Sequence, residues 1–133
     1  MSLDLAALDA AYLAFWRERH LCTLTTLRPD GTLHVVPVGA VFDPQARLAW
    51  VIASRSSRKV RNVLAYGLGG GPVALCQVDG VRWATLEGRG RVRMETESVE
   101  DAERRYAERY RPPRRNPERV VVEIEVTRAM GRV

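Results

Sequence analysis

The sequence has few of the residues on which several common kinds of site depend. It contains two cysteines and two histidines, with no Cys-x-x-Cys pair and no histidines at metal-ligand spacing, so no metal site is expected. Cys22 and Cys76 each lie alone in an apolar run, which favours buried thiols over a disulfide. No apolar run approaches the roughly 20 residues that a membrane-spanning helix needs. The segment Met1–Leu8 lacks a basic region and carries Asp4, so no secretory signal is expected, and we predict a cytoplasmic protein with no membrane partner.

Lysine is also scarce, although the chain is basic. The net charge of +5 and the pI near 9.9 favour an anionic partner. Lys59 is the single lysine, against twenty arginines. An arginine bias fits genome composition, so the one remaining lysine hints at a position that prefers an ammonium group. Aromatic residues make up only 7% of the chain, and Trp83 is the main one among the cations, so nucleic-acid binding is not favoured.

The length of 133 residues and a hydrophobic fraction of 46% predict one domain over residues 1–133. Strands are predicted at Leu21–Leu27, Leu33–Phe42, Leu48–Ser54, Val73–Val78, Arg82–Glu87, Gly88–Met94 and Val120–Thr127. Helices are predicted from Leu5 to Trp16, from Ser56 or Ser57 to Gly67, and from a capping Ser98 to Tyr110. Pro37 indicates a sheet edge or a bulge. Short antiparallel strands joined by tight turns predict a mainly β barrel with flanking helices.

The segment Ser54–Asn62 carries the strongest chemical signal. It holds four cations, three serine hydroxyls and no acid. It lies at the start of a predicted helix, where free backbone N–H groups favour an anion. The segment can be interpreted as a phosphate site or as a solvated basic helix face, and the residues alone leave both open. It is not a P-loop, because the Gly-x-x-x-x-Gly-Lys spacing is absent.

A second group of cations alternates along a predicted strand. Arg89, Arg91 and Arg93 must share one face of that strand. Such a stripe is usually solvated, but it can also bind an anionic tail or nucleic-acid phosphates. Gly88 and Gly90 mark places where the backbone can closely approach a ligand or another chain.

Several motifs, taken in order, resemble a known superfamily. They are LTTLRPDG at Leu24–Gly31, HVVPV at His34–Val38 and SRK at Ser57–Lys59. Together they resemble the split β-barrel flavin and deazaflavin oxidoreductases, the pyridoxamine 5′-phosphate oxidase-like superfamily. QVDGVRW at Gln77–Trp83 and LEGR at Leu86–Arg89 resemble more narrowly the actinobacterial F420-dependent reductases, and most of all the F420H2-dependent biliverdin reductases. Residues 101–112 and 116–123 continue this similarity.

This resemblance implies a six- to seven-stranded antiparallel split barrel that forms a homodimer, with the cofactor in a groove between protomers. The residues expected along the cofactor ring are Val36, Pro37, Val38, Ala53 and Ser54. Those expected at the phosphate are Ser57 and Lys59, assisted by Arg55, Arg58 or Asn62. Gln77 and Trp83 are expected near the cofactor or substrate, supplied by the partner subunit. No catalytic acid is assigned, because the cofactor supplies the hydride and the protein orients the rings.

The implied reaction is hydride transfer from reduced coenzyme F420 to an unsaturated acceptor, here the central methine bridge of biliverdin. F420 carries a phosphodiester and an anionic glutamyl tail, and biliverdin carries two propionates, so a basic chain suits both. Two alternatives stay open. One is an FMN-binding oxidoreductase related to pyridoxamine 5′-phosphate oxidase, and the other is a non-catalytic module that binds a flavin or a tetrapyrrole.

Overall fold

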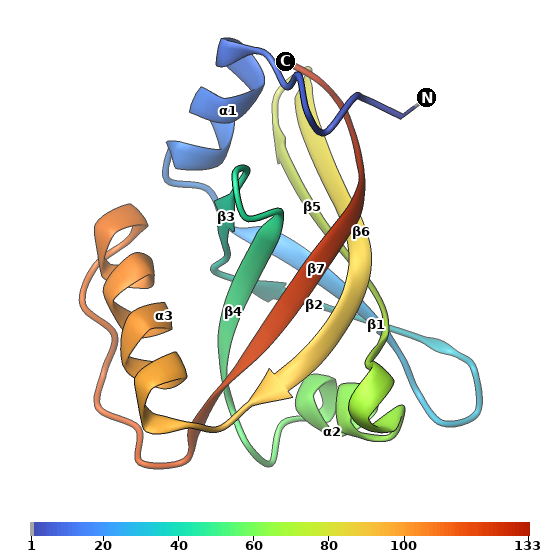
Figure 1. The fold of residues 1–133 in the computed structure, drawn as a ribbon, viewed down its shortest axis with the longest axis vertical. Coiled ribbons are helices and arrows are strands. Elements are labelled where there is room, and N and C mark those ends of the chain that lie inside the picture. The colour runs from blue at the N-terminus through green and yellow to red at the C-terminus, as the bar shows by residue number, and fades with distance from the viewer. Residues whose placement is uncertain (1) are drawn as a thin grey trace.

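The computed structural model describes residues 2–133, which form a seven-stranded antiparallel sheet and three α-helices (Figure 1). The strands are β1 (Cys22–Leu27), β2 (Leu33–Val38), β3 (Val41–Asp43), β4 (Leu48–Ser54), β5 (Gly71–Asp79), β6 (Arg82–Arg93) and β7 (Arg119–Arg132). The helices are α1 (Ala10–Arg17), α2 (Arg58–Leu64) and α3 (Thr96–Arg109), and a short 3-10 helix, η1 (Gly67–Gly69), follows α2. The order across the sheet is β2-β1-β5-β6-β7-β4-β3. The predicted mainly β fold with flanking helices is confirmed.

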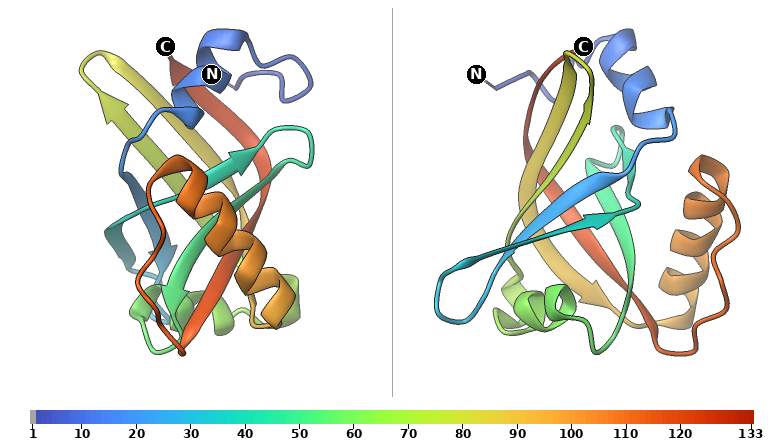
Figure 2. Two further views of the ribbon diagram at one scale, coloured as in Figure 1. Left: turned by 90° about the vertical axis from the view of Figure 1, so that its left-hand side faces the viewer. Right: turned by 180° about the vertical axis from the view of Figure 1, so that it is seen from behind.

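The three helices leave part of the sheet uncovered. Helix α1 lies at one end of the barrel and α2 at the other, while α3 lies against β4 (Figure 1). Seen from behind, β1 and β2 lie in front with no helix over them (Figure 2). No helix within residues 2–133 is long and apolar enough to cross a membrane.

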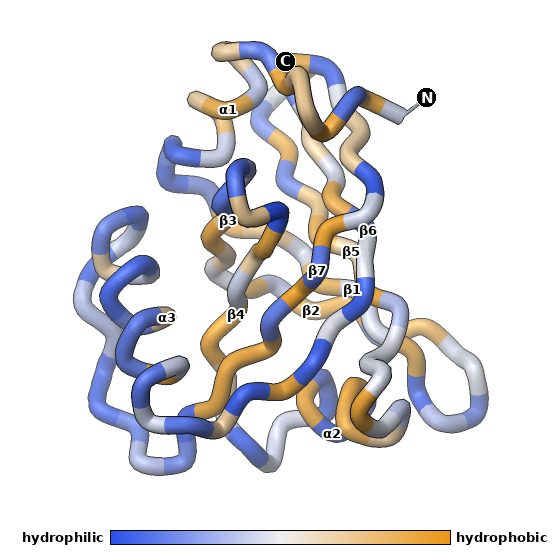
Figure 3. The backbone as a smooth tube through the Cα atoms, viewed as in Figure 1, coloured by the Kyte–Doolittle hydropathy of each residue, from blue (hydrophilic) through white to orange (hydrophobic). Residues whose placement is uncertain are grey.

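Strand β4 is covered on both faces, which explains why its sequence is almost wholly apolar. Ala49, Val51 and Ala53 point into the main core inside the barrel. Trp50 and Ile52 point the other way and join a smaller cluster under α3. Most of β4 is accordingly hydrophobic in Figure 3. Because β4 packs between two apolar layers, its position is fixed. The loop that leads from β4 into α2 therefore starts from a fixed point.

The predicted edge position of Pro37 is confirmed. Strand β2 pairs with β1 alone among the described strands, and Pro37 lies opposite Thr23. The missing N–H of Pro37 therefore interrupts no central ladder.

The prediction of one continuous strand over Leu33–Phe42 is wrong. The chain leaves β2 at Gly39 and Ala40 and enters β3 at the opposite edge of the sheet. Helix α3 causes this break. A Cβ at Gly39 would lie 2.6 Å from the Tyr106 ring, and Ala40 exchanges hydrogen bonds with α3 and the residue after it instead of with a strand.

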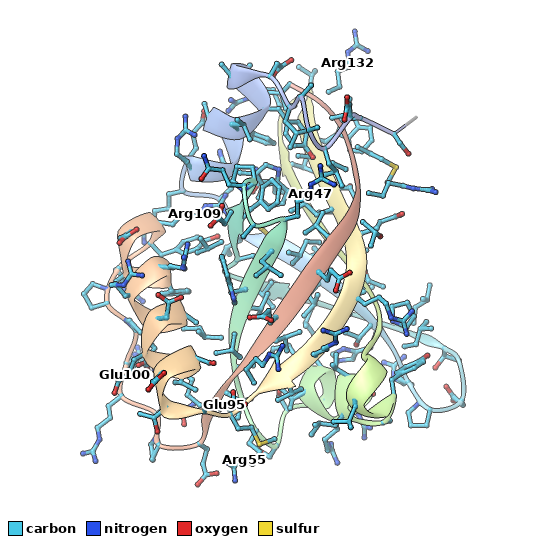
Figure 4. The ribbon with its side chains drawn as sticks, viewed as in Figure 1. Arg47, Arg55, Glu95, Glu100, Arg109 and Arg132 are labelled. Carbon is cyan, nitrogen blue, oxygen red and sulfur yellow. The ribbon has the colours of Figure 1, made fainter. Side chains whose placement is uncertain are left out.

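Two predicted helix starts also need correction. Helix α1 begins at Ala10 rather than at Leu5, because the Asp9 carboxylate accepts a 2.8 Å bond from the Tyr12 N–H and caps the first turn. The preceding segment is extended at Leu3, which bridges to β7. Helix α3 begins directly after Glu95 (Figure 4), so Ser98 lies inside the helix and is not its cap.

Ion pairs between residues three and four apart support α3 on its surface. Asp101 pairs with Arg105 at 3.0 Å. Arg104 pairs with Asp101 and with Glu108.

Strand β6 is one long strand where the sequence predicted two shorter ones. It carries a β-bulge between Glu87 and Gly88, and β7 continues beside it to Arg132. A Cβ at Gly88 would lie 1.9 Å from the Glu125 carbonyl oxygen. The close backbone approach predicted at Gly88 is thus made by a neighbouring strand of the same chain.

Both cysteines are free thiols. Cys22 is buried in the core and Cys76 is half-buried on β5. The prediction that they form no disulfide is confirmed.

Candidate cofactor site

The segment between β4 and α2 gathers positive charge without balancing carboxylates. None of its four cations forms an ion pair with any residue in the described range 2–133. These cations are Arg55, Arg58, Lys59 and Arg61. Arg55 extends from the loop at the foot of the molecule (Figure 4). A group of cations that share no internal partner suits an external anion.

The serine hydroxyls of this segment hold the loop in shape. The backbone N–H and the hydroxyl of Ser57 both donate to the Ser54 carbonyl, at 3.0 and 2.7 Å. The Ser54 hydroxyl in turn accepts a 2.9 Å bond from Asn116. Ser57 stands at the N-cap position of α2 but makes no side-chain cap bond, and α2 is only seven residues long. We therefore attribute anion binding here to side chains rather than to the end of the helix.

Lys59 and His34 lie close enough to influence each other electrostatically. Burial lowers the pKa of Lys59. Burial also lowers the pKa of His34, and the nearby charges of Arg28, Lys59 and Arg58 lower it further. We call Arg28, His34, Arg58 and Lys59 the cation cluster. It joins the tight turn after β1, the edge strand β2 and the start of α2.

Sequence reasoning overlooked His34 as a member of this site, because it tested the two histidines only as metal ligands. The hairpin register could have revealed it. His34 lies opposite Thr26, which is buried, so its side chain shares the inward face with Val36 and Val38.

Asn62 ties α2 to β1. Its side-chain N–H donates to the Thr26 hydroxyl at 2.9 Å, and the side chain is fully buried. Its carbonyl oxygen Oδ1 is buried without a hydrogen-bond partner, as is Nδ1 of His34. Since buried polar atoms are normally paired, two such atoms beside one cluster of cations point to a polar group that completes the site.

The residues expected along the cofactor ring are divided between the two faces of the sheet. Val38 and Ala53 are buried in the core, and Val36 packs against it. Pro37 is exposed on the outer face. Ser54, half-buried, lies where β4 meets the basic loop. The structure thus brings Val36 and Ser54 toward the cation cluster and leaves Pro37 on the opposite side of β2.

The arginine stripe of β6 is partnered within the chain. Arg93 pairs with Glu123 at 3.2 Å and Arg91 with Glu125 at 3.8 Å, both across the ladder to β7. Arg89 donates to two carbonyl oxygens of the glycine segment before β5, at 3.1 and 2.9 Å. These internal bonds compete with nucleic-acid phosphates or an anionic tail, the alternatives that the sequence left open.

Comparison with known proteins places this chain in a family. The family profile described as pyridoxamine 5′-phosphate oxidase matches residues 8–131. The chain is also 51% identical over 119 residues to the F420H(2)-dependent biliverdin reductase of Mycobacterium tuberculosis, covering 90% of this chain and 84% of that protein. The chain belongs to the pyridoxamine 5′-phosphate oxidase family.

Solved structures agree on the fold. An F420 reductase superposes with a TM-score of 0.72 at 20% identity, covering 92% of this chain and 98% of that one. A conserved hypothetical protein of Mycobacterium tuberculosis superposes with a TM-score of 0.74 at 24% identity, covering 94% of this chain and 84% of that one. At such identities the likeness establishes the split-barrel fold.

In this member of the pyridoxamine 5′-phosphate oxidase family, Gln77 belongs to the core. Its side-chain N–H donates to the Phe15 carbonyl at 3.0 Å, and its carbonyl oxygen accepts a 2.6 Å bond from Arg109 and a 3.6 Å contact from Cys22. Only 1% of Gln77 is exposed. The residue therefore has no surface to offer a cofactor, and we do not carry it into the proposed site.

Trp83 lies far from the basic loop within one chain. It is 38% exposed and pairs with Arg132 near the end of β7. Arg132 and Arg55 mark opposite ends of the molecule in Figure 4. A family member of this shape can bring Trp83 to the basic loop only from a second protomer.

A groove of about 400 Å³ lies on the uncovered outer face of the sheet. Residues from five strands line it, among them Thr25, Leu33, Ala74, Gly88 and Thr127. Neither Ser57 nor Lys59 lines this groove. The basic loop and the groove are therefore separate features of one chain.

One cluster of potential metal ligands was not expected from the sequence. Ligand atoms of Glu18, His20 and Asp79 lie within 4.8 Å of one another. Arg82 bonds to both carboxylates. The Arg82 guanidinium, and then His20, lower the pKa of Glu18 to about 2. The carboxylates are thus already neutralised by a cation of the chain.

Proposed function

We propose that this protein is an F420H2-dependent reductase that transfers a hydride from the reduced deazaflavin to an unsaturated acceptor, with biliverdin as the first candidate. The observation that carries the proposal is the 51% identity, over 90% of the chain, to an F420H(2)-dependent biliverdin reductase. A match of this extent covers both the basic loop and the strands around it. The cationic loop supports the proposal independently, because F420 carries a phosphodiester and a glutamyl tail.

The residues of the chain fit such a cofactor. Lys59 supplies an ammonium group that is partly buried. Ser57 lies two residues before it in the sequence. We propose that both hold the phosphate, Ser57 by turning its hydroxyl from the Ser54 carbonyl to the anion, with Arg55 and Arg58 assisting. The two buried unpaired atoms on His34 and Asn62 support a polar ligand at this place rather than a solvated helix face.

The cofactor, when bound, supplies the hydride, so the protein's tasks are binding, orientation and the exclusion of water. We propose that Val36, Val38 and Ala53 form the apolar floor beneath the ring, because all three belong to the core or pack against it. Ser54 lies at the edge of that floor, whereas Pro37 lies on the opposite side of β2. The acceptor gains a hydride and a proton, and the reduced cofactor loses both, so the exchange is balanced without another reductant.

We further propose that the protein is a homodimer, as the family resemblance implies. The uncovered outer face of β2, β5 and β6 carries exposed apolar side chains: Leu33, Val35, Val78 and Trp83. Several exposed apolar side chains on one face that no helix covers support an interface there. A second copy seated there would contribute its own Trp83 near the basic loop. A cytoplasmic location remains the prediction made from the sequence.

Replacing Val35 by aspartate should shift the protein from dimer to monomer, because an unpaired charge would be buried at the interface. Sedimentation velocity measures the change. Leu68→Asp is the matched control: Leu68 is 99% exposed but lies in η1, and its variant should remain dimeric. A wild-type protein that sediments as a monomer would refute the dimer.

The cofactor assignment predicts tight binding of F420 and weaker binding of FMN. Titration of the purified protein with each cofactor, followed by cofactor fluorescence, measures both affinities under identical conditions. Tight FMN binding without any response to F420 would overturn the proposal in favour of an FMN oxidoreductase. Binding of F420 without oxidation of its reduced form by any acceptor would instead favour a non-catalytic module.

A further inference from the structure

His34 is a titratable group that the proposed function has not yet used. It stands on the edge strand β2, opposite the buried Thr26 of β1. Residues directly opposite on one face of an antiparallel pair have side chains in contact range. Thr26 accepts the hydrogen bond from Asn62 of α2. His34 is thus linked through one neighbour to the helix that carries Lys59.

The hydrogen-bonding capacity of His34 is unused within the described residues 2–133. Its Nδ1 is buried and has no partner. The charged groups that act on its ring come from two elements, Arg28 from the turn after β1 and Arg58 and Lys59 from α2, and all three are positive. Thr26, which faces it from β1, is uncharged. No carboxylate is among these groups, so none of the charged groups that act on the ring favours its imidazolium form.

We propose that His34 is a further ligand of the bound phosphate, supplied by the edge strand β2 to complete the site formed by Ser57 and Lys59. This inference rests on the proposed function, because it requires the F420 phosphodiester to bind at the cation cluster. The imidazole donates a hydrogen bond to a phosphate oxygen and takes up a proton from solvent as the anion arrives. The anion is the negative partner that the cluster otherwise lacks.

The proton uptake gives cofactor affinity a definite pH dependence. In the free protein, burial and three cations hold the pKa of His34 below its ordinary value. A phosphate beside the ring raises this pKa, because opposite charge favours the protonated form. Affinity for F420 therefore rises as pH falls from above the bound-state pKa to below the free-state pKa. The phosphodiester has no proton to lose near neutral pH, so the phosphate itself does not contribute to this dependence.

The test combines binding and proton counting on the intact protein. F420 dissociation constants are measured by fluorescence between about pH 5.5 and about pH 8, and calorimetry in two buffers of different ionisation enthalpy gives the protons taken up. We expect roughly tenfold tighter binding at the acidic end and proton uptake within that range. H34Q should lose both the pH dependence and the uptake. H20Q, which alters the only other histidine, should retain both.

NMR of the wild-type protein keeps the test independent of whether H34Q folds. Two histidine ring signals are expected, assigned with H20Q, and the His34 signal should move to a higher pKa when F420 binds. If F420 binds equally at all pH values with no proton uptake, and the His34 titration is unchanged, the role of His34 is refuted while the proposed function stands. If F420 does not bind at any pH, the proposed function fails, and the inference fails with it.

Discussion

Replacing Arg109 by alanine should lower the free energy of unfolding by about 3–5 kcal/mol. The guanidinium is buried at the end of α3 and satisfies three acceptors from separate parts of the chain. It donates to the Glu18 carbonyl at 2.8 Å, the Ala40 carbonyl at 2.6 Å and the Gln77 side chain at 2.6 Å. Alanine would remove this donor from all three acceptors. Ala40 and Gln77 are buried and would keep only the longer contacts from Tyr110 and Cys22, and weakening the hydrogen bonds of buried groups is costly.

Urea denaturation followed by circular dichroism measures this loss. The Arg104→Ala variant is the matched control, because Arg104 lies on the same helix and its partners Asp101 and Glu108 are exposed to solvent. It should change stability by less than about 0.5 kcal/mol. A loss at Arg109 no larger than that at Arg104 would show that the buried hydrogen-bond network is not what joins α3 to the barrel.

Replacing Lys59 by alanine should weaken F420 binding roughly tenfold to a hundredfold, the range expected for losing a charge-assisted hydrogen bond. Lys59 is the single lysine of the chain, forms no ion pair within the described residues and is partly buried beside His34. The fold should not change, since no structural hydrogen bond depends on this side chain.

Fluorescence titration of the variant with F420, alongside its urea midpoint, separates affinity from stability. Arg61→Ala removes an equal charge from the exposed side of the same helix and should alter affinity less than about threefold. Equal losses at both positions would indicate that the loop attracts the cofactor only by its total charge. An unchanged affinity in Lys59→Ala would remove Lys59 from the site.

The parts of the fold that the sequence predicts well are those governed by local rules. The Pro29-Asp30-Gly31 and Asp79-Gly80 turns adopt the hairpins their residues favour, with positive φ at both glycines. The apolar run of β4 was bounded correctly because burial on both faces leaves a continuous signal. Similarity to a known superfamily then supplied the split barrel, which composition and periodicity alone do not specify.

The parts that the sequence does not predict depend on distant contacts. The break at Gly39 arises because α3, far along the chain, places Tyr106 against it. Gln77 is drawn into the core by Arg109, 32 residues away, although the motif around it suggested a cofactor contact. His34 can be recognised as a site residue only from the structure, in which the hairpin register and α2 place three cations near its ring. None of these long-range contacts produces a periodic pattern in the sequence.

The basic loop shows how the two kinds of information combine. Its residues alone were compatible with a solvated helix face. The structure adds that its cations form no ion pair within the described residues and that two buried polar atoms beside them, on His34 and Asn62, are unpaired. The arginines of β6 each contact an acceptor of the chain, although Nε of Arg91 is also buried without a hydrogen bond. The distinction between these two basic regions therefore comes from their neighbours and not from their charge.

The most direct test of the account is an anaerobic mixture of the protein, reduced F420 and biliverdin, monitored by the absorbance of both pigments. We predict that oxidised F420 appears in step with loss of biliverdin, one equivalent for one, and that neither change occurs without the protein. Reduced F420 that binds and stays reduced in the presence of biliverdin would contradict biliverdin reduction. Reduced F420 that neither binds nor reacts would contradict the central claim itself.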